Sequence, residues 1–220
     1  MSELEWLIKN LAEIIKRTAV NPAHGGEGEF KRANYIEELV GGLGFDVDRY
    51  DIKDDRGYIR SNLIVDVGEG KTIWIVSHLD TVAAGNGWKT EPFKLKVEGT
   101  RVYGRGVSDN GIGIMSSLLL LKWISEGKIK PAFNLKIAFL ADEEYGSNYG
   151  AKYLIEKGIV RPPAYAIIPD FGTRDGSRIE VAEKGILWIK MEVAGKQVHA
   201  SMPHKGDNAN LKASKYTIEL

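Results

Sequence analysis

The sequence predicts an α/β fold in which helices cover both faces of a mostly parallel sheet. Apolar runs at 71–78, 134–141 and 164–169 are suited to strands that are buried on both faces. Amphipathic stretches with helical spacing alternate with these runs along the chain, as expected for a sheet between two layers of helices. Each run is followed closely by His, Asp or Glu, and open parallel sheets bind their ligands outside the carboxyl ends of the strands. That edge is therefore the predicted functional site.

The elements are predicted in the following order. Helical spacing of Leu4, Leu7 and Leu11 indicates an amphipathic helix at 3–18, and a Gly/Pro-rich loop follows it. The next elements are a helix at 30–43 capped by Gly42 or Gly44, strands at 45–52, 61–68 and 71–78, and a long loop at 81–107 with short strands near Leu95 and Val102. A helix at 110–126, a strand at 134–141, a helix at 150–157 and a strand at 164–169 complete this part.

The pattern changes near Ile179. Residues 179–196 alternate between apolar and polar in two strand-like runs, which is typical of a sheet with one solvated face, and 208–220 has helical character. We place a domain boundary between Gly172 and Ser177. This gives a metal-binding catalytic domain at 1–175 and part of a second domain at 176–220. No compact small domain is complete at Leu220, so the chain is interpreted as a fragment.

Composition excludes several classes of protein. Thirty basic and thirty acidic residues balance to zero net charge, without the basic excess or stripe that a nucleic-acid-binding protein shows. The longest apolar run, Ile112 to Leu121, is too short to span a bilayer, and the charged start is unlike a signal peptide. We therefore expect a cytoplasmic protein with no membrane partner. Because the chain has no cysteine, any metal must be held by imidazole and carboxylate groups.

His78 and Asp80 follow one strand, and Asp170 follows another. His78 and Asp80 are two residues apart, so their side chains point to the same face. A metal-bound imidazole usually has its other nitrogen held by a carboxylate or carbonyl, which suits this pair. Taken alone, His78 could equally be a surface histidine and Asp170 a turn residue.

Three more acids are candidate residues of the same site. Asp109 lies between glycines at the start of a predicted helix, where it could be a helix cap or a metal ligand. Glu143 and Glu144 follow a buried strand; adjacent side chains diverge there, so they should have different roles. A lone Glu-Glu pair could also be a solvated turn. Asp142 is expected to lie outside the first shell of ligands.

The order H-x-D, Asp in a Gly-rich loop, Glu-Glu and Asp resembles the M20 metallopeptidases, the aminoacylase, carboxypeptidase and succinyl-diaminopimelate desuccinylase family. The segment GKQVHASMPHKGDNA also resembles the signature of the family's lid domain, with His199 at its histidine. The resemblance covers residues 5 to 220. It implies a zinc-exopeptidase-like catalytic domain, followed by the first part of an α+β lid and dimerisation domain.

The resemblance also implies a role for each residue. It makes His78, Asp109, Glu144 and Asp170 the metal ligands, with Asp109 bridging two divalent ions, which would be zinc with cobalt or manganese as alternatives. Asp80 would orient His78, and Glu143 would be the general base. His199 would reach a neighbouring subunit's site and stabilise the oxyanion of the tetrahedral intermediate. No role is assigned to His24 or His204.

The implied function is hydrolysis of the amide bond of small N-acyl amino acids, such as N-succinyl or N-acetyl derivatives, through a metal-bridging water. A dipeptidase or carboxypeptidase of the same family is the first alternative. The family's last ligand, a histidine near the carboxyl terminus, has no counterpart in the chain, so a catalytically incomplete metal-binding fragment is the second. A plain structural domain would require His78, Asp109 and Glu144 to lie far apart. The partners implied are a small N-acyl amino acid or dipeptide and a second copy of the chain, paired through the lid.

Overall fold

The chain forms two units, Met1–Ile179 and Glu180–Leu220, in a computed structural model that describes residues 1–161, 163, 165–173 and 175–219. The units are described separately. Ala164 of the strand predicted at 164–169 and Leu220 of the helix predicted at 208–220 lie outside the described residues.

A five-stranded sheet in the order β1-β2-β6-β3-β7 forms the centre of the first unit. Its strands are β1 (Asp48–Lys53), β2 (Ile59–Val67), β3 (Thr72–His78), β6 (Asn134–Leu140) and β7 (Ala166–Ile167). β3 is parallel to β6 and to β7, and β2 is antiparallel to both β1 and β6. Four strands therefore run in one direction and β2 in the other, which confirms the predicted mostly parallel sheet.

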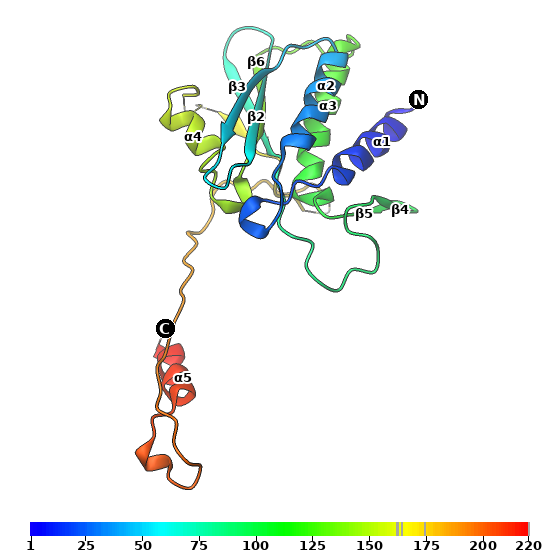
Figure 1. Ribbon diagram of the computed structural model, residues 1–220. Coiled ribbons are helices and arrows are strands. Elements are labelled where there is room, and N and C mark those ends of the chain that lie inside the picture. The colour runs from blue at the N-terminus through cyan, green and yellow to red at the C-terminus, as the bar shows by residue number, and fades with distance from the viewer. Residues whose placement is uncertain (162, 164, 174, 220) are drawn as a thin grey trace. The chain divides into compact units, whose positions relative to one another are not determined.

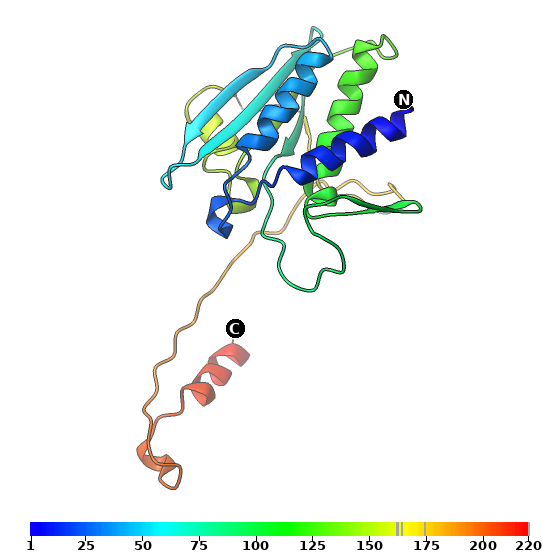
Figure 2. The same cartoon turned by 45° about the vertical axis from the view of Figure 1, so that its right-hand side comes forward.

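Helices cover both faces of this sheet, as predicted. α2 (Phe30–Gly42) and α3 (Ile112–Ser125) lie side by side on one face with α1 (Glu3–Lys16) beside them, and α4 (Ala151–Glu156) lies on the other face (Figures 1 and 2). Successive strand residues point to opposite faces, and β2 shows how the core divides. Leu63, Val65 and Val67 join the large apolar cluster beneath α1, α2 and α3, whereas Ile64 packs in a smaller cluster with Leu154 of α4.

The register of the sheet brings two chain segments together at its carboxyl edge. β3 and β6 are paired in parallel as far as His78 and Leu140, and the backbone N–H of Leu79 donates to the carbonyl of Leu140 over 2.7 Å. Residues 79–82 and 141–144 therefore leave the sheet next to each other.

The start of the helix after Asp109 differs from the prediction, and the short strands of the long loop agree with it. The helix predicted from Asn110 begins at Ile112, because Asp109 and Asn110 have non-helical backbone angles. The predicted short strands of the long loop are present as a hairpin of β4 (Lys96–Glu98) and β5 (Arg101–Tyr103).

The second unit contains a helix, α5 (Ala209–Glu219), in agreement with the prediction for 208–220. The strands predicted at 179–196 are wrong: the described residues there form only an isolated bridge between Lys196 and Asp207. A strand needs a neighbour to satisfy its backbone N–H and C=O groups, and none of the described residues pairs with 179–195. The apolar side chains of this segment, such as Val181 and Trp188, are exposed.

The predicted boundary between Gly172 and Ser177 includes Arg174, which lies outside the described residues. The assignment of 176–220 to a lid domain stays a prediction. None of the helices in the described part of the chain combines the length and apolar character that crossing a membrane requires.

Candidate metal centre

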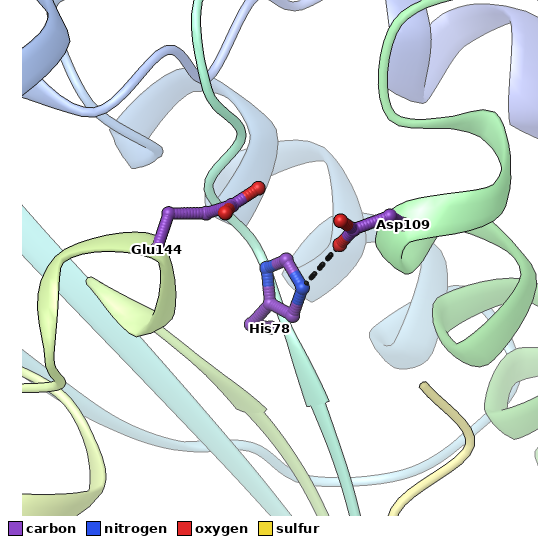
Figure 3. Close-up of side chains that lie close together, drawn as sticks. All are labelled: His78, Asp109 and Glu144. Atoms are coloured by element: carbon purple, nitrogen blue, oxygen red, sulfur yellow. Dashed lines mark hydrogen bonds and ion pairs between the residues drawn. The ribbon is translucent and has the colours of Figure 1, made fainter. Parts of the chain in front are cut away.

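His78, the last residue of β3, is at the centre of the site. Its imidazole is buried, and Nε2 lies 2.8 Å from Oδ1 of Asp109 (Figure 3). Nδ1 lies 3.0 Å from the backbone carbonyl of Asp80 and 3.5 Å from its Oδ1. The loop after β3 thus turns back on the ring and holds one nitrogen, as in metal sites where a second group orients the histidine.

The predicted ligands converge around this imidazole. One group, His78, Asp109 and Glu144, has a ligand atom from each residue within 4.8 Å of the others, and a second group consists of His78, Glu143 and Asp170. His78 Nε2 lies 3.9 Å from Glu143 Oε2 and 3.8 Å from Asp170 Oδ1. The distances by themselves therefore allow Glu143 to be a ligand or a base. A plain structural domain, which required these residues to be far apart, does not fit this geometry.

Hydrogen bonds hold the turn that follows β6 against the loop that follows β3. The backbone N–H of Glu143 donates to Oδ1 of Asp80 over 3.0 Å, and that of Val82 donates to Oε1 of Glu144 over 3.2 Å. Each loop therefore helps to position an acidic group of the other.

Asn110 is a residue of the site that the sequence analysis missed. It is buried, and its Nδ2 donates to Oδ1 of Asp170 and, over 3.3 Å, to the carbonyl of Pro169. Gly113 leaves the necessary space, because a Cβ there would lie 2.0 Å from Asn110 Oδ1 and 2.8 Å from the Pro169 carbonyl. The glycine one turn into the predicted helix was the available signal, since glycine is unfavourable inside a helix unless something approaches closely.

The cluster has more negative than positive charge. Burial lowers the pKa of His78, but the carboxylates of Asp109, Asp170 and Asp80 outweigh burial and raise that pKa to about 12. Burial, followed by repulsion from Asp109, raises the pKa of Glu144 to about 7. Burial also raises the pKa of Glu143. Raised pKa values of carboxyl groups that lie beside other carboxylates indicate a place where a cation would be stabilised.

The donor set fits a divalent cation. It consists of one imidazole and carboxylates, which suit zinc and also manganese, and it contains no thiolate. Exposed Asp109 and Glu143 lie on the Nε2 side of the His78 ring, and half-buried Glu144 belongs to the same cluster.

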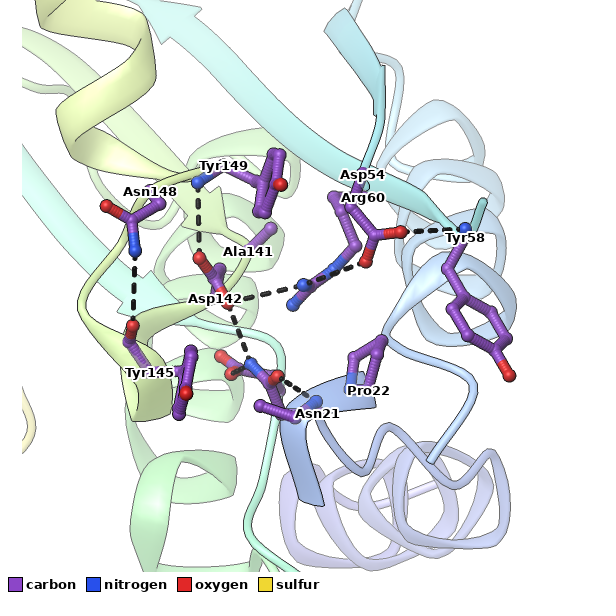
Figure 4. A network of polar contacts seen from close by, with 12 residues as sticks. Asn21, Pro22, Asp54, Tyr58, Arg60, Ala141, Asp142, Tyr145, Asn148 and Tyr149 are labelled. Atoms are coloured by element: carbon purple, nitrogen blue, oxygen red, sulfur yellow. Dashed lines mark hydrogen bonds and ion pairs between the residues drawn. The ribbon is translucent and has the colours of Figure 1, made fainter. Parts of the chain in front are cut away.

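Two other predicted residues lie apart from this cluster. Asp142 is buried and its carboxylate bonds to Asn21 and Tyr149, in agreement with its predicted place outside the ligands (Figure 4). His199 belongs to the second unit, where it is exposed and its Nδ1 lies 2.8 Å from Oγ of Ser201. Its role at a neighbouring subunit's site stays a prediction.

Comparison with known proteins identifies the family. The model of peptidase family M20/M25/M40 matches residues 74–217. The chain belongs to this family. The predicted resemblance is therefore confirmed.

Similar proteins agree with this assignment. An uncharacterised metallohydrolase of Methanocaldococcus jannaschii is 42% identical over 234 residues, which cover 100% of this chain and 57% of the relative. A probable succinyl-diaminopimelate desuccinylase of Staphylococcus aureus is 33% identical over 208 residues, covering 92% of this chain and 48% of the relative. The chain thus spans about half the length of the curated relatives that it matches.

Solved structures show the same fold. An M20 family metallo-carboxypeptidase of Sulfolobus solfataricus is 27% identical with a TM-score of 0.62, and the match covers 80% of this chain and 39% of that one. Human carnosine dipeptidase 1 has a TM-score of 0.67 at 21% identity, with 77% of this chain and 39% of that one covered. At that identity, the dipeptidase supports the fold alone.

Proposed function

We propose that the chain carries the metal-binding part of an amidohydrolase that cleaves small N-acyl amino acids with two divalent ions. The observation that carries this proposal is the convergence of Asp109, Glu143, Glu144 and Asp170 on the buried imidazole of His78. Four acids from three segments of the chain surround one histidine at the carboxyl edge of the sheet, where α/β proteins place their chemistry.

The residues divide between holding metal and moving protons. We assign His78 and Asp170 to one ion, Glu144 to the other, and Asp109 to both, with zinc as the expected metal and cobalt or manganese as alternatives. When bound, such ions polarise the substrate carbonyl and lower the pKa of the attacking water. Asp80 orients His78 through the contacts to Nδ1.

Glu143 is the proposed general base. Its side chain is about half exposed, and burial raises its pKa, so it can accept a proton and release it again in the same cycle. In the proposed reaction it takes the proton of the attacking water and delivers it to the leaving amine. Its backbone is fixed by the hydrogen bond to Asp80, which keeps the carboxylate at the edge of the cluster.

The substrate class rests on the relatives. The name of the 33% identical relative favours an N-succinyl amino acid. The carboxypeptidase at 27% identity supports the second candidate, cleavage of a dipeptide or of a carboxyl-terminal residue. Assays of N-succinyl and N-acetyl amino acids against dipeptides, with the longest available form of the protein, should rank the two. We further propose that residues 176–220 pair two copies of the chain and bring His199 to the partner's site.

The test of the site is metal content together with activity. Asp109→Ala should lose metal, whereas Glu143→Gln should keep metal and lose hydrolysis, because only the base is removed. Glu27→Gln, an exposed glutamate paired with Lys31 on the surface, is the matched control and should change neither. If Glu143→Gln loses metal, Glu143 is a ligand and the assignment of the base is wrong. Metal bound by a chain that hydrolyses none of these substrates would support the incomplete-fragment alternative.

A further inference from the structure

We propose that Asn21 is a positioning residue for the metal site, because its side-chain amide bonds the carboxylates of both Asp80 and Asp142. The inference rests on the proposed function, since it concerns the residues that orient the proposed ligand His78 and the acids Glu143 and Glu144.

The amide of Asn21 uses both of its N–H groups on carboxylates. Nδ2 donates to Oδ2 of Asp80 over 2.7 Å and to Oδ1 of Asp142 over 2.9 Å. Asn21 is 1% exposed, so water does not replace these bonds, and its Oδ1 accepts from the backbone N–H of Ala23 over 3.0 Å. A neutral donor therefore joins two buried anions that lie 59 and 121 residues away in the sequence.

The first bond acts on the histidine. Asp80 is fully buried, and its other oxygen, Oδ1, lies 3.5 Å from His78 Nδ1 and accepts from the backbone N–H of Glu143. With Asn21 holding Oδ2, the carboxylate cannot rotate without breaking a bond. Asp80 is thereby fixed in the orientation that holds the His78 ring.

The second bond acts on the acidic turn. Asp142 directly precedes Glu143, and it has a positive φ of 63° that a non-glycine residue rarely adopts. Its Oδ2 accepts from the backbone N–H of Tyr149 (Figure 4). Its backbone carbonyl accepts from the N–H of Ser147, so both the side chain and the backbone of Asp142 hold the turn at 142–149 together. Asn21 ties this turn to the loop after β3, and so sets where Glu143 and Glu144 point.

The backbone of Asn21 is held independently of its side chain. Its N–H donates to the carbonyl of Thr81 over 2.9 Å, and the N–H of Thr81 donates to the carbonyl of Ala19 over 2.9 Å. Shortening the side chain should therefore leave the loop in place while both carboxylates lose a donor. Asn21→Ser keeps an oxygen that can cap Ala23, and it is too short to reach both acids.

A buried asparagine elsewhere in the chain provides the matched control. Asn10 in α1 is 4% exposed, its Nδ2 donates to the carbonyl of Trp6 over 2.7 Å, and its Oδ1 accepts from Tyr35. Asn10→Ala removes a buried amide with comparable bonds, but none of these partners belongs to the metal cluster. A purely structural role for Asn21 predicts the same behaviour for Asn10→Ala and Asn21→Ala.

The experiment compares zinc affinity and thermal stability in wild type, Asn21→Ala, Asn21→Ser and Asn10→Ala. Affinity is measured by competition with a chromophoric chelator, and the melting temperature is measured on metal-free protein. All three variants should melt at a lower temperature than wild type. Only the Asn21 variants should lose zinc affinity, by roughly 10- to 100-fold, as found for residues that orient metal ligands.

Each outcome decides the question. Wild-type affinity in a folded Asn21 variant would overturn the inference and leave the proposed function intact. If Asn21→Ala does not fold, Asn21→Ser supplies the same comparison. If wild type binds none of zinc, cobalt and manganese, the proposed function itself is overturned, and the positioning role with it.

Discussion

Arg60 on β2 is expected to be the most sensitive polar residue of the fold. Its guanidinium is almost fully buried among three carboxylates, of which Figure 4 shows Asp54 and Asp142. Nε and Nη2 donate to Glu29 over 2.8 and 3.1 Å, and Nη1 lies 3.2 Å from Asp142 and 3.5 Å from Asp54. Glu29, Asp54 and Asp142 are themselves buried, so solvent cannot compensate them if the cation is removed.

The perturbation is Arg60→Met, which keeps much of the volume and removes the charge. Breaking one buried ion pair costs about 3–5 kcal/mol, because the partner is left as an uncompensated buried charge. Arg60 serves three such partners, so we expect the upper part of that range. For a domain of this size, about 2–4 °C is lost per kcal/mol, so the melting temperature should fall by roughly 8–20 °C.

The assay is thermal and urea unfolding of metal-free protein, followed by circular dichroism. Arg49→Met on the neighbouring strand β1 is the matched control. Arg49 pairs with Glu37 and, over 2.9 Å, with Asp51, and both acids are more than a third exposed. Exposed pairs contribute at most about 1 kcal/mol. If Arg60→Met destabilises the protein no more than Arg49→Met, the reasoning about uncompensated buried charge is refuted.

Three further predictions follow from the structure. Gly150→Ala should destabilise the protein by about 1–3 kcal/mol in the same assay, because its Cβ would lie 2.0 Å from the Ala141 carbonyl. Gly41→Ala is the control and should not destabilise the protein, because no atom lies within 4 Å of its Cβ. A chelator should lower the melting temperature of wild type and leave that of Asp109→Ala unchanged, because bound metal stabilises only a folded site. Since the pKa of Glu144 is raised to about 7, its carboxyl holds a proton below that pH. Zinc should therefore displace more protons at about pH 6 than at about pH 8.5, measured by calorimetry in two buffers, and equal release would contradict the assignment of Glu144 as a ligand.

The layers of the fold and the position of the site were predictable because they follow from local patterns. Apolar runs identify the buried strands, helical spacing identifies the covering helices, and the edge where parallel strands end is a general place for function. These rules were sufficient to expect His78, Asp109, Glu143 and Glu144 close together, and the structure places them there.

The strands predicted at 179–196 show where such patterns are insufficient. Alternation indicates only that a segment suits a half-buried strand, and the strand forms only if a neighbour supplies its hydrogen bonds. The exposed Trp188 and Val181 carry the pattern without such a neighbour among the described residues. Asn21 and Arg60 were missed because no sequence pattern marks them. A single asparagine before a proline or an arginine in a strand has no periodicity, and the partners of each become known only after distant segments have met.

The chain is neutral overall, but the acids of this region form two layers with different compensation, a buried inner layer and a more exposed outer layer. The inner acids, Glu29, Asp54 and Asp142, surround Arg60 and pair with it within the protein. The outer layer consists of Asp80, Asp109, Glu143 and Asp170. Within the described part of the chain, these acids form ion pairs with His78 alone. Asn21 joins the layers as a neutral donor, so it adds no charge to either. The outer acids have His78 as their cation among the described residues, and Asp109 and Glu143 are half or more exposed, so an ion from solvent can reach them. This accessibility is the physical reason for locating the metal there and nowhere deeper.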